Sequence, residues 1–208
     1  NHCFRDLMEI LRPRIKIQAI IHFQLPMLSL KRGHDGAEGE MLSTHALVAP
    51  HKVAGLLWHN RRHVFFSRFL GIDATANPQA RLREFWRQVP ANDPRLGAVL
   101  RDYVSSGVAS NAEDFYARAI PIALHGDAVP CTKRMSLDAI SWSSCLSQTL
   151  TTKDAEWFIS GVLDKCVGRT TKKRLWAIVI WSLGPMLTGK NPLRDWNRHN
   201  WIPGTDDA

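Results

Sequence analysis

The stretch at residues 118–131 most constrains what this chain can fold into. Its apolar residues Ile120, Ile122 and Leu124 recur with period two, and the run stops at His125-Gly126-Asp127. This pattern predicts a β-strand that ends in a tight turn and presents Asp127 at its C-terminal edge. Open α/β sheets place ligands and metal ions at that edge. Gly-Asp is also ordinary turn chemistry, and spacing alone favours a turn-capping role for Asp127.

The residues that follow predict two more strands and a helix. Residues 137–145 alternate without a strongly polar face, which indicates a buried strand paired with the first. Residues 157–163 have strand composition, although residues 151–154 resemble a helix N-cap; we expect a third strand. Residues 170–183 form the clearest helix, which Gly189 and Pro192 end. The predicted order is strand, strand, strand, helix.

The preceding residues predict mostly helices. Helices are expected from Pro50, from Pro78 and over residues 96–100, with one strand-like alternation at residues 15–23 closed by Pro26. The Gly-rich polar segment 31–40 predicts an exposed loop. We therefore expect an α/β (α+β) protein with a mainly helical region over residues 1–117 and a smaller α/β region over residues 118–208.

Composition and charge narrow the class of partner and the compartment. The 208-residue chain carries a formal net charge of +8 and has a pI near 9.7, which favours an anionic partner. No apolar run approaches the ~20 residues needed to span a bilayer, and the first residues lack a signal-peptide pattern. The four cysteines form no C-x-x-C pair, so free thiols in a reducing compartment fit best. We expect a nuclear or cytoplasmic protein that is not secreted and meets no membrane.

Two histidines stand at a spacing that metal sites use. His59 and His63 are four residues apart, so a helix would place both side chains on one face. No acidic residue near them offers a third ligand. The pair therefore predicts a solvated basic face rather than a metal site.

Several blocks of residues together resemble a known family. They are His125-Gly126-Asp127 with Pro130, Ser141-Trp142-Ser143-Ser144, Trp181-Ser182, Asp195-Trp196-Asn197, Pro50-His51 and Trp58-His59-Asn60. In these blocks, which cover most of residues 42–201, the chain is similar to an uncharacterised protein family present in many copies in dinoflagellate algal genomes. It departs from the family where a Gly-rich insert normally follows the His-Gly-Asp block, because only Cys131-Thr-Lys-Arg134 stands there.

The resemblance implies a mobile-element protein, similar to transposases with a ribonuclease-H-like fold. Residues 118–208 would then be a partial ribonuclease-H-like sheet with a packed helix, truncated before the later strands. Asp127 would be the first catalytic, metal-binding carboxylate, supported by His125. Such enzymes hold two divalent ions, Mg²⁺ or Mn²⁺, about 3.5–4 Å apart for phosphoryl transfer. The family's second carboxylate is expected beyond the long helix, after this chain ends. Asp195 is the late candidate here, and its loop position favours a solvated turn residue.

Two other functions remain open. The first is a non-catalytic interaction or nucleic-acid-binding module, in which a basic run meets phosphates. The residues of this run are Lys165, Arg169, Lys172, Lys173 and Arg174. We expect DNA rather than RNA as the nucleic acid, and a homo-oligomer is left open. The second is a hydrolase that uses Cys131, Ser143 or Cys145 with His125; it ranks last because the G-x-S-x-G nucleophile motif is missing.

Overall fold

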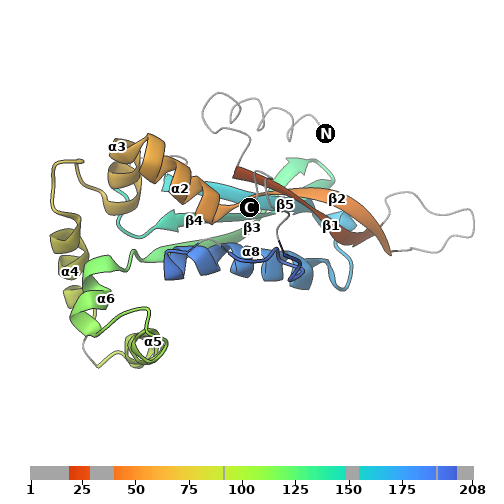
Figure 1. Cartoon of the computed structure of the whole chain (residues 1–208). Coiled ribbons are helices and arrows are strands. Elements are labelled where there is room, and N and C mark those ends of the chain that lie inside the picture. The colour runs from red at the N-terminus through yellow and green to blue at the C-terminus, as the bar shows by residue number, and fades with distance from the viewer. Residues whose placement is uncertain (1–18, 29–39, 91, 149–154, 191, 201–208) are drawn as a thin grey trace, which may run out of the picture. The chain divides into compact units, whose positions relative to one another are not determined.

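The computed structural model describes residues 19–28, 40–90, 92–148, 155–190 and 192–200 (Figure 1). The predictions for residues 3–18, 31–39 and 151–154 lie outside this part. Helices and antiparallel strands both occur, which confirms the mixed α/β class. The strands are β1 (Ile20–Leu28), β2 (Glu40–Val48), β3 (Ile122–Thr132), β4 (Met135–Ser144) and β5 (Trp157–Leu163). The helices are α2 (Pro50–Asn60), α3 (Arg62–Phe65), the π-helical η2 (Phe66–Leu70), α4 (Pro78–Gln88), α5 (Pro94–Ser105), α6 (Ala112–Arg118), the 3₁₀ turn η3 (Asp164–Cys166) and α8 (Thr171–Thr188). None of these helices combines the length and the apolar character that a membrane crossing needs.

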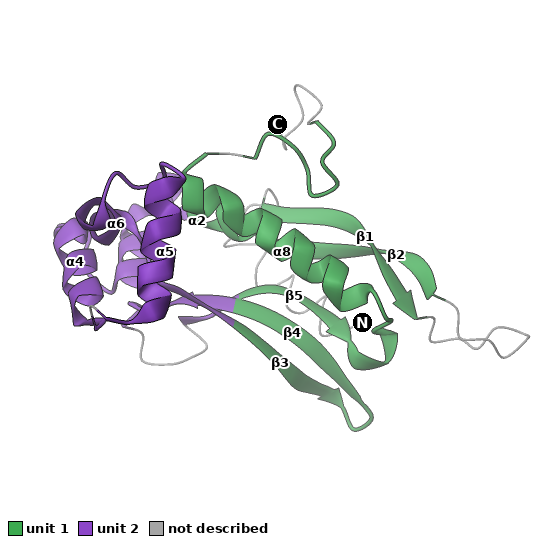
Figure 2. Ribbon diagram, turned by 90° about the horizontal axis from the view of Figure 1, so that it is seen from below, with its two compact units in different colours: residues 1–56, 125–141, 158–208 green, residues 57–124, 142–157 purple. Residues whose placement is uncertain are grey.

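The chain divides into two compact units that are interleaved in sequence. Unit 1 takes its residues from 1–56, 125–141 and 158–208, and unit 2 takes its residues from 57–124 and 142–157 (Figure 2). The sequence predicts one boundary after residue 117, because local patterns show where the composition changes from helical to strand-like. They do not show which distant segments pack together. Each of β3, β4, β5 and α2 contributes residues to both units.

Unit 1 contains an antiparallel hairpin of β1 and β2, with Ile20 opposite Val48. In β1 the side chains of Ile21, Phe23 and Leu25 are buried while the intervening His22 and Gln24 are exposed, so the alternation there does specify a strand. The strand continues past Pro26, where the sequence predicts its end. The hairpin places two strands within a region predicted to be mainly helical; β2 was not predicted, since its buried residues come only at its end.

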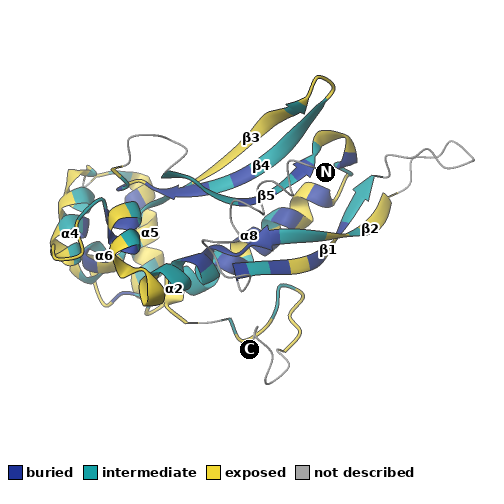
Figure 3. Ribbon diagram, turned by 90° about the horizontal axis from the view of Figure 1, so that it is seen from above, coloured by how far each residue is buried: buried dark blue, intermediate teal, exposed yellow. Residues whose placement is uncertain are grey.

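The second sheet has the strand order β3-β4-β5, and α8 follows. The three strands and the helix occur in the predicted order. The predicted turn at His125-Gly126-Asp127 is wrong, because β3 continues to Thr132 and the chain turns at residues 133–134. Gly126 does not have a positive φ and stays in the extended strand. Among the described strands β3 lies at the sheet edge, where Pro130 is tolerated. Figure 3 shows β3 exposed along most of its length, whereas β4 is buried or half-buried.

Unit 2 has two notable features, capped helices and a cluster of aromatic rings. Helices α4, α5 and α6 begin at the N-caps Asn77, Asp93 and Asn111, whose side-chain oxygens accept backbone N–H groups of the first turn. The other feature is a cluster of aromatic rings. It consists of Trp58, Phe65, Phe66, Phe69, Trp142 and Trp157. The helices predicted from Pro50 and Pro78 and over residues 96–100 are confirmed.

Candidate functional site

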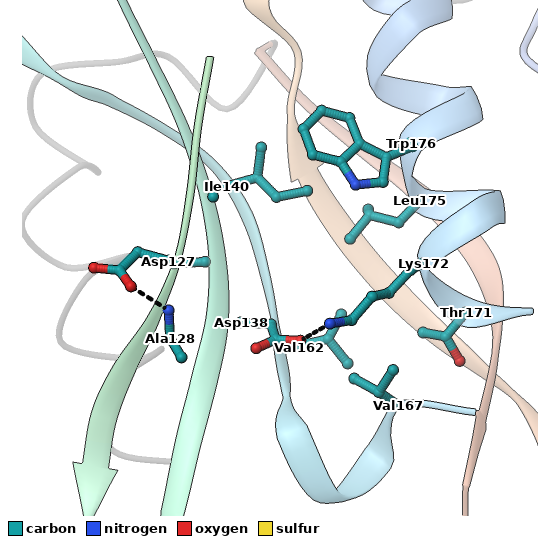
Figure 4. Close-up of a pocket in the computed structure, with 12 residues that line it drawn as sticks. Asp127, Ala128, Asp138, Ile140, Val162, Val167, Thr171, Lys172, Leu175 and Trp176 are labelled. Carbon is teal, nitrogen blue, oxygen red and sulfur yellow. Dashed lines mark hydrogen bonds and ion pairs between the residues drawn. The ribbon is translucent and has the colours of Figure 1, made fainter. Parts of the chain in front are cut away.

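A pocket of about 260 Å³ in unit 1 opens between the second sheet and α8 (Figure 4). Its floor is apolar, because the buried side chains of Ile140, Val162 and Leu175 line it. Polar side chains stand beside this floor: Asp127 from β3, Asp138 from β4 and Lys172 from α8. The alternation of strand residues and the helical period of α8 explain why apolar and polar groups reach the same hollow.

Asp127 lies in the middle of β3 and is exposed. Its Oδ1 accepts a hydrogen bond from the backbone N–H of Ala128 at 2.7 Å. In Figure 4 the carboxylate points away from Lys172 and Asp138. His125 stands two residues earlier in the same strand, so its side chain leaves the same face. The Asp127 carboxylate is thus solvated, with a local backbone contact.

Asp138 is the pocket carboxylate that the sequence did not single out. Its Oδ2 lies 2.7 Å from Nζ of Lys172, and the two side chains are 30% and 64% exposed. The ion pair links β4 to the first turn of α8. Sequence reasoning could not find it, since the two residues are distant in the chain and only the tertiary structure of unit 1 brings them together.

No group of three His, Cys, Asp or Glu side chains able to hold a metal ion occurs among the described residues. His59 and His63 are both exposed in unit 2. Asp195 acts as a loop-closing residue: its Oδ1 accepts the backbone N–H groups of Asn197 and His199 at 2.9 and 2.7 Å. That agrees with the turn role favoured for Asp195.

The basic run surrounds the beginning of α8. Arg174 has structural partners, because its guanidinium donates to the carbonyl of Gln24 at 3.2 Å and to Oδ1 of Asn197 at 2.9 Å. Lys165, Arg169 and Lys173 are exposed. The first turn of α8 contains no acidic residue. Two cations of the run, Lys172 and Arg174, therefore have partners within the protein, and the other three face solvent.

The nucleophiles named for a hydrolase are poorly placed for that chemistry. Ser143 is only 8% exposed. Cys145 is exposed, but partial desolvation raises the pKa of its thiol, which lowers the fraction of reactive thiolate. Cys131 contacts the carbonyl of Val129 in its own strand at 3.5 Å.

The sequence analysis also missed two histidine–serine pairs in unit 1, in which a half-buried histidine meets a buried serine. Nε2 of His45 lies 3.1 Å from Oγ of Ser160, and Nδ1 of His51 lies 2.8 Å from Oγ of Ser182. Both serines are fully buried, so a substrate cannot reach their hydroxyl groups. Burial lowers the pKa of both histidines, and that of His51 falls to about 4. These pairs join segments of unit 1 as neutral hydrogen-bonded groups.

No protein-family model matches the chain, and no curated protein or solved structure matches it at a significant level.

Proposed function

We propose that this chain is a non-catalytic nucleic-acid-binding module that contacts backbone phosphates through the basic run at the beginning of α8. The observation that carries the proposal is the first turn of α8, which holds Lys172, Lys173 and Arg174 and no acidic residue. An N-terminal turn usually favours acidic side chains, because the helix macrodipole is positive there. Cations at this position cost stability, and an external anion would offset that cost.

Phosphate groups are the anions that suit this arrangement. α8 has 18 residues, so its dipole is fully developed, and the backbone N–H groups of its first turn add donors to the side-chain cations. The net charge of +8 attracts a polyanion over a longer range. A duplex supplies phosphates at regular spacing, and each one neutralised by a cation releases counterions. This supports DNA as the partner.

The cations of the basic run differ in whether their side chains already have partners within the protein. Lys172 is paired with Asp138 and Arg174 holds Gln24 and Asn197, so changing either would disturb unit 1. Arg169 and Lys173 are exposed, and their side chains make no hydrogen bond or ion pair within the described part of the chain. These two are therefore the informative positions for charge reversal.

The double variant Arg169→Glu/Lys173→Glu should bind a labelled DNA duplex more weakly and with less salt dependence. Each lost phosphate contact should reduce the slope of log affinity against log salt by about 0.9, so the slope should fall by about 2. Fluorescence anisotropy over a salt series measures both quantities. Arg95→Glu/Arg101→Glu is the matched control, since it changes two exposed arginines of α5 and alters the net charge equally. An equal loss of duplex affinity in both double variants would contradict the proposal, because it would show that binding depends only on net charge.

A second candidate is a metal-dependent phosphoryl-transfer protein, a transposase or integrase fragment, with Asp127 as ligand and catalytic group. One observation favours it: Asp127 is exposed on an edge strand, and Asp138 lines the same pocket. Mg²⁺ or Mn²⁺ would need several oxygen ligands, and Lys172 competes for Asp138. The candidate therefore predicts weak metal binding by this chain.

Titration of the whole chain with Mn²⁺ should then show weak binding that disappears in Asp127→Asn. The change removes one ligand charge and leaves the shape of the side chain almost unaltered. Asp102→Asn is the control, because Asp102 is an exposed aspartate in α5 of unit 2. Isothermal calorimetry or the electron paramagnetic resonance signal of free Mn²⁺ provides the measurement. Binding that survives in Asp127→Asn would remove Asp127 from the candidate metal site.

A further inference from the structure

A second surface, in unit 2, combines an exposed tryptophan with cations. We call residues 58–63, Trp-His-Asn-Arg-Arg-His, the Trp58 surface; they run from the last turn of α2 into α3, and all are exposed. Trp58 is 41% exposed. The guanidinium carbon of Arg62 lies 4.5 Å from the centre of the Trp58 ring, within cation–π distance.

The Trp58 ring is held in place although much of it faces solvent. Phe65 meets it edge-on with ring centres 5.2 Å apart, and Phe66 stacks on it at 6.1 Å with 18° between the planes. Phe65 and Phe66 are themselves buried. Arg62 also lies over the Phe66 ring, at 5.4 Å. An exposed aromatic group that is already ordered loses little entropy when a ligand stacks on it.

The charged residues of the Trp58 surface itself, Arg61 and Arg62, are both cationic. Residues 41–72 contain no Asp or Glu, so the sequence offers the Trp58 surface no acidic neighbour within this range. Neither Arg61 nor Arg62 takes part in any ion pair formed by the described residues. A basic surface that only kept the protein soluble would not require an exposed tryptophan at its centre.

We propose that the Trp58 surface binds single-stranded nucleic acid. An unpaired base stacks on the Trp58–Arg62 pair, and Arg61 approaches the adjoining phosphates. Aromatic rings and guanidinium planes stack on any base, because every base has a π-face. In a duplex those faces are covered by neighbouring base pairs, so the surface discriminates single strands from duplexes. The residues involved belong to unit 2, and the inference stands independently of the phosphate contacts proposed for α8 in unit 1.

The test compares Trp58→Ala with the unchanged chain, using labelled thymidine and uridine oligonucleotides and a labelled DNA duplex. Loss of the stacking ring should weaken binding of the thymidine strand by about tenfold, within the range known for base–aromatic stacking, and leave duplex binding unchanged. The uridine strand reports whether RNA is accepted equally. Trp58→Phe should retain most of the affinity because it retains a π-face. Leu193→Ala, at an 88% exposed apolar residue, is the control for truncation at the surface.

A second variant protects the test against misfolding. Arg61→Glu leaves the aromatic contacts in place and should weaken single-strand binding, with the salt slope reduced by about 0.7 for the lost phosphate contact. Arg95→Glu, the same change on α5, should leave single-strand binding nearly unaltered. The proposal is overturned if Trp58→Ala weakens duplex and single strand equally, or if neither Trp58→Ala nor Arg61→Glu changes single-strand binding. If Arg169→Glu/Lys173→Glu leaves duplex binding unchanged, this result contradicts the phosphate contacts proposed for α8 and not the Trp58 surface.

Discussion

Replacing Trp142 with alanine should lower the free energy of unfolding by about 3–5 kcal/mol, the usual cost of removing a fully buried large aromatic side chain. Trp142 is completely buried in unit 2, with its ring centre 5.2 Å from that of Phe69. Phe69 in turn stacks on Phe65 and Trp157 at 4.7 and 6.0 Å. The cavity would therefore open at the centre of the aromatic cluster. Urea denaturation followed by circular dichroism measures the change.

Two further variants make this result specific. Trp58→Ala is the same substitution at a 41% exposed position of the same cluster, and it should cost less. Trp142→Phe should also cost less than alanine, because the cavity is smaller and because the indole N–H of Trp142, which has no hydrogen-bond partner in the described structure, is removed. Equal costs for Trp142→Ala and Trp58→Ala would contradict the burial on which this prediction depends.

Acidification should destabilise the fold through His51. Burial, with a smaller effect from the charge of Lys52, lowers the pKa of His51 from 6.5 to about 4. Between these two pH values the unfolded chain binds the proton more readily than the folded chain does, so stability falls as pH decreases. His51 contributes its full stabilisation above pH 6.5, and the loss is complete below about pH 4. The loss due to this group should be at most about 3 kcal/mol.

The contribution of His51 can be isolated with His51→Gln. An amide can still bond to Ser182 but does not titrate, so the pH dependence of the variant's unfolding free energy should be shallower between pH 6.5 and about 4. The groups that face His51 are the hydroxyl and carbonyl of Ser182, the ring of Trp181 at 5.4 Å and the charge of Lys52. If the unfolding free energy of His51→Gln depends on pH as steeply as that of the unchanged chain, His51 is not the cause of the acid destabilisation.

Local patterns in the sequence account for most of the individual elements. The strands β4 and β5 and the helix α8 follow from alternation or helical period over short windows. The N-caps at residues 77, 93 and 111 were not predicted, although their residue types are those that commonly cap helices. The extent of β3 was mispredicted because Gly126-Asp127 is a frequent turn pair. An edge strand can carry the same residues in extended form, and only pairing with β4 decides between the two.

The candidate site was less predictable, because its contacts join distant residues. The basic run and Asp127 could be named from the sequence, and Asp127 and Lys172 line one pocket. The ion pair of Asp138 with Lys172 and the hydrogen bond of His51 with Ser182 depend on how α8 packs in unit 1. In the sequence analysis the residues of the Trp58 surface entered only as a pair of histidines and as a block of the family resemblance. The signal that could have revealed the surface was the long stretch without acidic residues.

The interleaving of the two units has a consequence for synthesis on the ribosome. Unit 2 starts later in the chain, yet all of its segments have been made once residue 157 is added. Unit 1 starts first but must wait for α8, which ends at Thr188. Until then the apolar face of the β1–β2 hairpin, with Ile21, Phe23 and Leu25, lacks its helix, and a hairpin alone is marginally stable in water. Between the completion of β2 at Val48 and that of α8 at Thr188, a nascent chain would therefore expose this apolar strand pair, the kind of surface that promotes aggregation of incomplete folds.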